Sequence, residues 1–289
     1  MLKRTKGEKV FNAFNIAFLI LLCIITIYPL YYVFICAFSD GAAVVSGDVL
    51  LYPVKPTLSA VRRVFKIEYF LSSLGNSVFY TVAGTIVSII VTTMGSYTLS
   101  RKRVIGRHAM GLFISFTMWF SAGIIPAYLN FDSLNLINTR ASLIFGFAVN
   151  AFYVILMRSY FDSLPVELEE AAKMDGMGDF GIFLKIMLPM STPMLATIVL
   201  YCALDRWNSY FWAMILLKSE KLIPLQVLLR KIIVDMQVLD TLDVPSNMDY
   251  SRETVIYATI AISIIPSLVV YPFIQKYFVK GITIGSVKG

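Results

Sequence analysis

The stretch that decides the fold is residues 69–100, YFLSSLGNSVFYTVAGTIVSIIVTTMGSYTLS, which contains no Asp, Glu, Lys, Arg or His. The hydrocarbon core of a bilayer is about 30 Å thick, and a helix needs roughly 20 predominantly apolar residues to cross it. This run is long enough to span a membrane as one helix.

Five further uncharged runs have the same character. They cover residues 10–39, 109–131, 141–157, 186–204 and 254–275. The chain is 58% hydrophobic and 15% charged, whereas soluble domains are about 45–50% apolar and about 25% charged. Unbroken apolar runs exclude a transmembrane barrel, whose strands alternate apolar and polar residues. We therefore predict an all-α integral membrane protein with six transmembrane helices.

The distribution of Lys and Arg predicts the orientation in the membrane. With a cytoplasmic N-terminus, the inside segments carry 14 of these residues and the short outside segments carry 5. Lys and Arg favour cytoplasmic loops. We expect both termini and the 158–190 loop to be cytoplasmic, and loops 40–68 and 218–253 to lie outside.

The 158–190 loop is unusually acidic for a cytoplasmic segment. Pro165 can begin a helix, and acidic side chains in its first turns suit the helix dipole. Gly176 and Gly178 would end that helix, and a second short helix would run to Leu188-Pro189. A helix–turn–helix of this kind can dock into a groove on another protein. An amphipathic hairpin lying on the membrane without a partner is the alternative.

The residue spacing in this loop resembles the EAA motif of permease subunits of binding-protein-dependent ABC importers. Glu170-Ala171-Ala172 is followed after three residues by Gly176, after nine more by Ile186, and after one more by Leu188-Pro189. The resemblance implies the type I ABC importer permease fold with cytoplasmic EAA coupling helices. It assigns coupling to an ATPase to Glu170, Ala171, Ala172, Asp175, Gly176, Ile186, Leu188 and Pro189.

Three other segments narrow the resemblance to carbohydrate permeases. Residues 205–213, DRWNSYFWA, resemble their Trp-Asn segment. Residues 120–126 and the tail 275–289 are similar to the LplC-like subgroup of maltose-permease-like subunits, which is associated with complex oligosaccharides. The implied function is that of a membrane-spanning permease subunit of an ATP-driven oligosaccharide importer in a bacterial cell membrane.

The implied domain organisation has three parts. Residues 1–68 form a cytoplasmic arm, the first transmembrane helix and an outside loop; residues 69–280 form the transmembrane core; residues 281–289 form a cytoplasmic tail.

The implied partners are a second homologous permease, a cytoplasmic ABC ATPase dimer and an extracytoplasmic sugar-binding protein or lipoprotein. The chain has no G-x-x-x-x-G-K-[ST] phosphate loop, the motif that cradles nucleotide phosphates. ATP and Mg would therefore be bound by the ATPase. We expect no cofactor or metal on this chain, which would be a non-catalytic subunit.

A pathway for the sugar is predicted near the end of the fifth span. If a helix runs from residue 192 to about residue 211, Asp205, Asn208 and Trp212 share one face. Trp207, Tyr210 and Phe211 would form an adjoining aromatic face. Polar groups could bind sugar hydroxyls, and aromatic rings could stack on the sugar. The alternative is a local Asp205–Arg206 pair with the aromatics in a headgroup belt.

Other functions are less consistent with the sequence. His108 is the single histidine, and neither G-x-S-x-G nor H-E-x-x-H occurs, which disfavours a membrane enzyme. An ion-coupled secondary transporter would need acidic residues within its spans, and only Asp205 is a candidate. An ABC importer for a solute other than a sugar remains an alternative.

Overall fold

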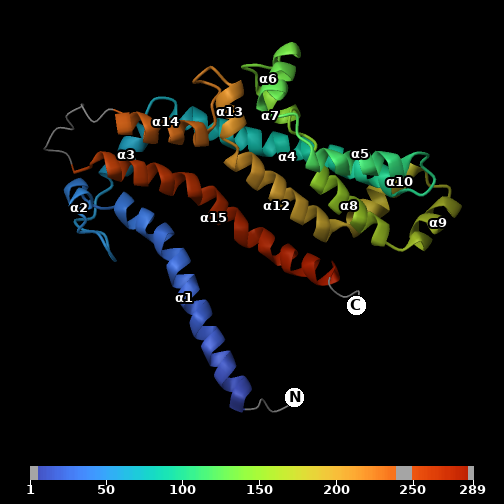
Figure 1. The fold of residues 1–289 in the computed structure, drawn as a ribbon, viewed down its shortest axis with the longest axis horizontal. Coiled ribbons are helices and arrows are strands. Elements are labelled where there is room, and N and C mark those ends of the chain that lie inside the picture. Colours follow the sequence, from blue (N-terminus) through green and yellow to red (C-terminus); the bar gives the residue numbers. More distant parts are fainter. Residues whose placement is uncertain (1–5, 239–248, 286–289) are drawn as a thin grey trace. The chain divides into compact units, whose positions relative to one another are not determined.

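The computed structural model describes residues 6–238 and 249–285. Within these ranges every regular element is a helix (Figure 1), which confirms the all-helical architecture. The chain divides into two compact units, Met1–Glu68 with Leu229–Ile265 and Tyr69–Leu228 with Pro266–Gly289. Part of the predicted outside loop 218–253 and part of the tail 281–289 lie outside the described residues.

The first unit is built around the end of its long N-terminal helix. It contains α1 (Lys6–Ala37), α2 (Gly41–Val45), α3 (Ser59–Phe65), most of α14 (Leu225–Val238) and the first half of α15 (Arg252–Gly285). Cys36 and Val49 are fully buried in a small core there. Gly41 permits a close backbone approach, because a Cβ at this position would lie 2.3 Å from the backbone nitrogen of Ser251.

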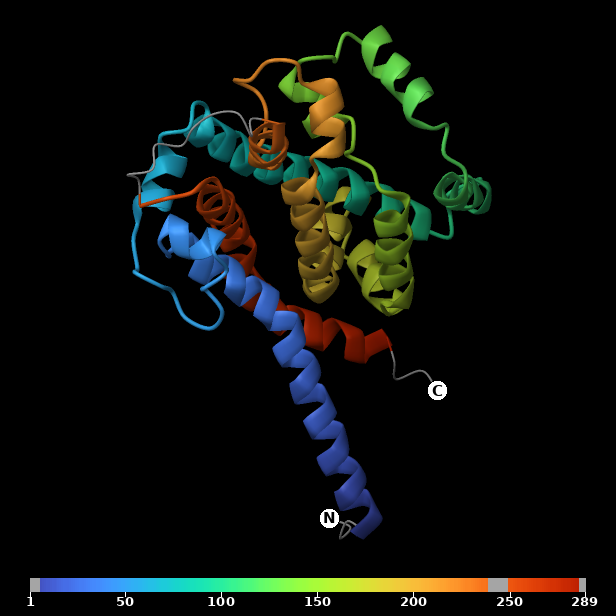
Figure 2. The same cartoon turned by 60° about the vertical axis from the view of Figure 1, so that its left-hand side comes forward.

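The second unit holds the remaining helices. They are α4 (Phe70–Ser100), α5 (Arg107–Trp119), α6 (Ile124–Ser133), α7 (Arg140–Phe145), α8 (Ala151–Ser163), α9 (Val166–Met174), α10 (Asp179–Ile182), the π-helical turn η1 (Phe183–Met187), α11 (Leu188–Met190), α12 (Thr192–Asn208) and α13 (Phe211–Leu216). Helix α4 packs against α8 and crosses α12 (Figure 2).

Most of the apolar runs correspond to helices that could cross a membrane. In the described part of the chain, α1, α4 and Arg252–Val269 of α15 are long and apolar enough to do so alone. Two further pairs of helices are bent at a short break. The α5–α6 pair is bent by 118°, and the pair formed by Asp179–Met190 and α12 is bent by 83°. If each pair is one span, up to five helices could cross the membrane.

The run 141–157 is not one continuous helix. Helix α7 ends at Phe145 and α8 begins at Ala151, where the Asn150 side chain accepts a hydrogen bond from the backbone N–H of Phe152 at 2.9 Å. Irregular backbone at membrane depth is tolerated where its polar groups have partners within the protein. The guanidinium of Arg206 supplies them, since it donates to the carbonyl oxygens of Leu143 and Phe147.

Small side chains on α4 make room for this arginine. Gly84 faces Arg206, and Ser88 accepts a hydrogen bond from its Nη2 at 3.0 Å. Further along α4, the Ser96 hydroxyl donates to the carbonyl of Val154 in α8 at 2.8 Å. Small and hydroxyl residues allow helix backbones in a membrane to approach closely, and here they make room for a half-buried cation.

Gly84→Leu should therefore destabilise the second unit. A Cβ at Gly84 would already lie 3.1–3.2 Å from the Arg206 side chain, and overpacking of this kind costs about 1–3 kcal/mol. We expect a lower Tm for the purified chain in detergent. Gly75→Leu on the same helix is the control, because no atom lies within 4 Å of its Cβ position. Equal Tm values for the two variants would contradict this packing.

Candidate functional site

The 158–190 loop forms the helix–turn–helix predicted from the sequence. Pro165 precedes α9, and Glu167 and Glu169 lie in its first turn. Helix α9 then carries the Glu170-Ala171-Ala172 segment. After the turn, α10, η1 and α11 lead to the bend before α12.

The two alanines of the motif differ in burial, although they are adjacent on α9. Ala172 is 4% exposed and packs in a core cluster with Tyr97, Phe161 and Met187. Ala171 is exposed, as are Glu170 and Asp175. Only one of the two alanines can therefore meet a partner protein directly.

The second half of the motif attaches the loop to the helical core. Ile186 and Leu188 are half-buried against the same cluster, whereas Pro189 is exposed. The loop therefore has a buried root and an exposed tip.

Gly176 ends α9 through its backbone conformation. Its φ is +76°, in the left-handed region that side chains other than glycine disfavour. The Gly176 N–H donates to the carbonyl of Lys173, and the Met177 N–H donates to the carbonyl of Ala172, both at 2.9 Å. This is the hydrogen-bond pattern of a Schellman motif. Nothing lies within 4 Å of a Cβ at Gly176, so the requirement is conformational rather than steric.

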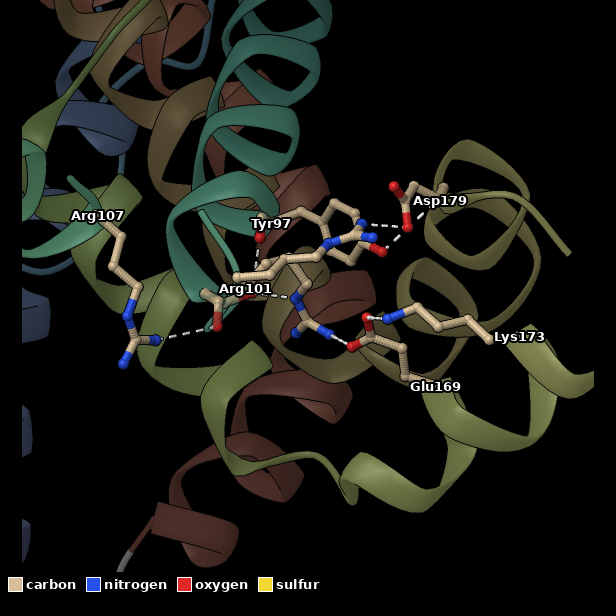
Figure 3. A network of polar contacts seen from close by, with 8 residues as sticks. Tyr97, Arg101, Arg107, Glu169, Lys173 and Asp179 are labelled. Carbon is tan, nitrogen blue, oxygen red and sulfur yellow. Dashed lines mark hydrogen bonds and ion pairs between the residues drawn. The ribbon is translucent and has the colours of Figure 1, made fainter. Parts of the chain in front are cut away.

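A network of charges joins α9 to the end of α4 (Figure 3). The carboxylate of Glu169 forms an ion pair with Arg101 and accepts a second hydrogen bond from Lys173 at 2.6 Å. The Arg101 guanidinium also lies 4.7 Å from the centre of the Tyr97 ring. The Arg101 and Glu169 side chains are each only 10% exposed.

The electrostatics of this network keep Glu169 charged. Burial alone raises the pKa of its carboxyl, but the hydrogen bond from Lys173 and the charge of Arg101 outweigh burial and lower the pKa below its usual value. Removing one partner of a buried ion pair costs about 3–5 kcal/mol, because the other charge is left unpaired.

A second ion pair lies beside the first and is much more exposed. Arg103 pairs with Asp179 at the start of α10, and both side chains are about half exposed, at 50% and 51%. The hydrogen bond to Asp179 raises the pKa of Arg103. Exposed ion pairs typically contribute only about 0–1 kcal/mol, so this pair is the weaker attachment.

Sequence reasoning missed Glu169 and Arg101 as a pair. In the sequence, Arg101 was counted only among the Lys and Arg residues that predict the orientation of the chain in the membrane. One signal was available, because Glu169 lies three residues before Ala172 and so shares its face of α9. An acid on the buried face of a helix requires a cationic partner.

A cavity of about 240 Å³ with both polar and apolar lining lies among α4, the α7–α8 connection, α8 and α12. Its lining includes Tyr80, Ser88, Asn150, Tyr153, Asp205 and Ser209. The hydroxyl of Tyr153 donates to the Asp205 carboxylate at 2.5 Å. Arg206 also borders the cavity, but its guanidinium is bound to Ser88 and to backbone carbonyls.

Of the residues predicted to line a sugar pathway, only Asp205 borders this cavity. The prediction that Asp205, Asn208 and Trp212 share one helix face is wrong, because α12 ends at Asn208 and Trp212 belongs to α13. Trp212 packs against Phe131 and Phe147.

The remaining pathway candidates lie around the end of α12. Trp207 is buried, whereas Asn208 and Tyr210 are exposed. The described residues contain no cluster of three His, Cys, Asp or Glu side chains that could hold a metal ion.

The N-terminal end of α4 holds the segment that follows α13. The Asn76 side-chain amide donates to the carbonyls of Lys221 and Ile223, at 2.8 and 3.2 Å. The Tyr80 hydroxyl donates to the carbonyl of Leu222 at 2.8 Å. Tyr80 thus touches both the cavity and this segment.

Long apolar helices that could cross a membrane, together with an anchored helix–turn–helix, define the architecture of a membrane transport component. The chain belongs to the family of binding-protein-dependent transport system inner membrane components, whose model matches residues 92–284.

Individual relatives align over almost the whole chain. It is 40% identical to the polygalacturonan/rhamnogalacturonan transport system permease protein YtcP of Bacillus subtilis, over 98% of this chain and 99% of that protein. It is 39% identical to protein LplC of the same organism, over 99% and 97% of the two chains. A chain from the crystal structure of a bacterial ABC transporter involved in import of the acidic polysaccharide alginate superposes with a TM-score of 0.89 and 44% identity, covering 96% of this chain and 100% of that one.

Gly176→Val should disturb the loop more than Gly178→Val. Valine at φ +76° is strained, whereas Gly178 has φ −72°, which any residue adopts. The left-handed conformation costs roughly 1–2 kcal/mol for residues other than glycine. Hydrogen exchange of residues 166–177 should be faster in Gly176→Val and unchanged in Gly178→Val. Equal exchange in both variants would show that the turn does not depend on the left-handed conformation.

Proposed function

We propose that this chain is the permease subunit of an ATP-driven oligosaccharide importer and forms half of its translocation pathway. The observation that carries the proposal is the cytoplasmic loop, whose root is buried in the transmembrane core and whose tip is exposed. Family membership and relatives named for the transport of polygalacturonan, rhamnogalacturonan and alginate support the choice of substrate class.

The exposed tip would dock into a cytoplasmic ATPase dimer. Glu170, Ala171 and Asp175 would touch the ATPase, with Gly176 setting the direction in which the chain leaves α9. Ile186, Leu188 and Pro189 would carry the motion into α12. ATP and Mg would be bound by the ATPase alone, and this chain would contribute no catalytic group.

The cavity would form part of the sugar pathway. Asp205 offers a carboxylate, Tyr153 an aromatic ring, and Asn150 a side-chain amide. Asn208 and Tyr210 would extend the polar and aromatic lining toward the outer end of α12. Hydroxyl groups and flat C–H faces of a sugar match these two kinds of side chain.

The complete importer would contain a second homologous permease and an extracytoplasmic sugar-binding protein. Helix α1 supports an assembly of this kind in a lipid bilayer, because no residue of its most apolar 18-residue window is buried within this chain. Both termini and the 158–190 loop would be cytoplasmic.

The Glu170→Lys variant tests the coupling role. The assay is uptake by the complete complex in proteoliposomes, with oligosaccharides of galactose, rhamnose, arabinose, galacturonate and mannuronate as the panel. Import of at least one member should require both ATP and the loaded binding protein. Glu170→Lys should abolish import, because an exposed acid that faces the ATPase is replaced by a base.

Glu167→Lys is the matched control, since Glu167 is an exposed acid on the same short helix. It should import at nearly the normal rate. Normal import by Glu170→Lys would rule out its part in coupling, and failure of the unaltered complex to import any sugar of the panel would rule out the substrate class.

The proposed orientation predicts which positions an impermeant thiol reagent reaches. In a chain without Cys23, Cys36 and Cys202, a cysteine replacing Ser46 should be labelled in whole cells, because Ser46 is exposed and would lie outside. A cysteine replacing Met174, which is 88% exposed on α9, should be labelled only after the cells are opened. Labelling of position 174 in intact cells would reverse the orientation.

A further inference from the structure

Helix α4 has specific polar contacts at three depths. At its outer end, Asn76 and Tyr80 hold the segment 221–223. In its middle, Ser88 accepts a hydrogen bond from Arg206 beside the cavity. Directly after its last residue, Arg101 pairs with Glu169 of the cytoplasmic loop. One helix therefore contacts the outer segment, the cavity and the cytoplasmic loop.

The contact with Glu169 is the strongest polar attachment between α4 and this loop. Both side chains are largely buried, and both have further partners. Lys173 also donates to Glu169, and Arg101 lies over the Tyr97 ring and donates through Nε to the Ser100 hydroxyl at 3.0 Å. A buried charge bound from two sides cannot swing away without leaving unpaired charge in a low-dielectric environment.

Glu169 is adjacent to Glu170, but the two carboxylates have different surroundings. Glu170 is exposed, whereas Glu169 is 7% exposed and points at Arg101. Because the two residues belong to one rigid turn of α9, a displacement of the exposed side of the helix also displaces the Glu169 carboxylate.

We infer that Glu169 and Arg101 are positioning residues that lock α9 to α4, so that movement of the cytoplasmic loop moves the cavity wall and the outer segment with it. This inference rests on the proposed function. The ion pair is a second mechanical connection between the loop and the cavity wall, beside the continuous chain through α10, η1 and α12. The two connections meet at Arg206, which belongs to α12 and is hydrogen-bonded to Ser88 of α4.

The test measures coupling in the complete complex, as ATP hydrolysed per sugar imported. Glu169→Gln and Arg101→Gln should each raise this ratio by about fivefold or more, the lower end of typical coupling factors. Hydrolysis and assembly with the ATPase should persist, because Glu170 and the exposed tip are unchanged. Arg101→Lys keeps the charge and should recover part of the coupling.

The neighbouring ion pair supplies the matched control. Arg103→Gln and Asp179→Asn remove the exposed pair and should leave the ratio within about twofold of normal, as expected for a weak surface contact. A rise in these controls equal to that in the Glu169 and Arg101 variants would overturn the specific role of the buried pair.

The double variant Arg101→Gln with Glu169→Gln covers the case in which a single variant does not assemble. It leaves neither member of the pair as an unpaired buried charge, so it should assemble, yet it should remain poorly coupled. Normal coupling in the assembled double variant would overturn the inference. If the unaltered complex shows no hydrolysis that depends on the loaded binding protein, the proposed function itself fails, which is a separate result.

Discussion

The close packing of α4 against α8 and α12 is the interaction on which the rest of the second unit depends. Gly84 and Ser88 of α4 leave room for the Arg206 side chain, which lies beside α4 and reaches the carbonyls of the α7–α8 break. Without that cation the carbonyl groups of the break would lose these hydrogen-bond partners, and leaving a buried polar group unsatisfied costs about 1–3 kcal/mol. Residues of the same break, among them Phe147 and Asn150, line the cavity.

The sequence was sufficient to predict the features that arise from local patterns. Long uncharged runs predicted an all-helical membrane protein, and the Pro165 and Gly176 signals predicted where α9 begins and ends. Each of these features depends on residues within a few positions of one another. Gly176 illustrates this, since the left-handed end of a helix is a backbone property that one residue type suits best.

The sequence was not sufficient where a distant side chain determines the local structure. The run 141–157 reads as one apolar helix, and its interruption is compensated by Arg206, some sixty positions away. The same limit applies to Tyr153 with Asp205 and to Arg101 with Glu169. The shared face proposed for Asp205 and Trp212 failed for a local reason, because α12 stops at Asn208 and no strong stop signal marks that position.

The 158–190 loop has a buried side and an exposed side. Ala172 and Glu169 face the core and attach the loop to it, whereas Ala171 and Glu170 are exposed on the surface of the loop. A permease that responds to an ATPase needs both properties, because an exposed tip without a fixed root would move without moving the membrane helices. Glu169, which is buried, and Glu170, which is exposed, provide both properties within one turn of α9.

If the buried ion pair locks α9 to α4, the 158–190 loop and α4 move as one body. The distance between spin labels at Leu71, exposed near the start of α4, and Phe180, exposed in α10, measures this in the complete complex with and without ATP. We expect the same modal distance in both states. A distance that shifts with nucleotide would show that the loop pivots on α4 and that the ion pair does not lock the two together.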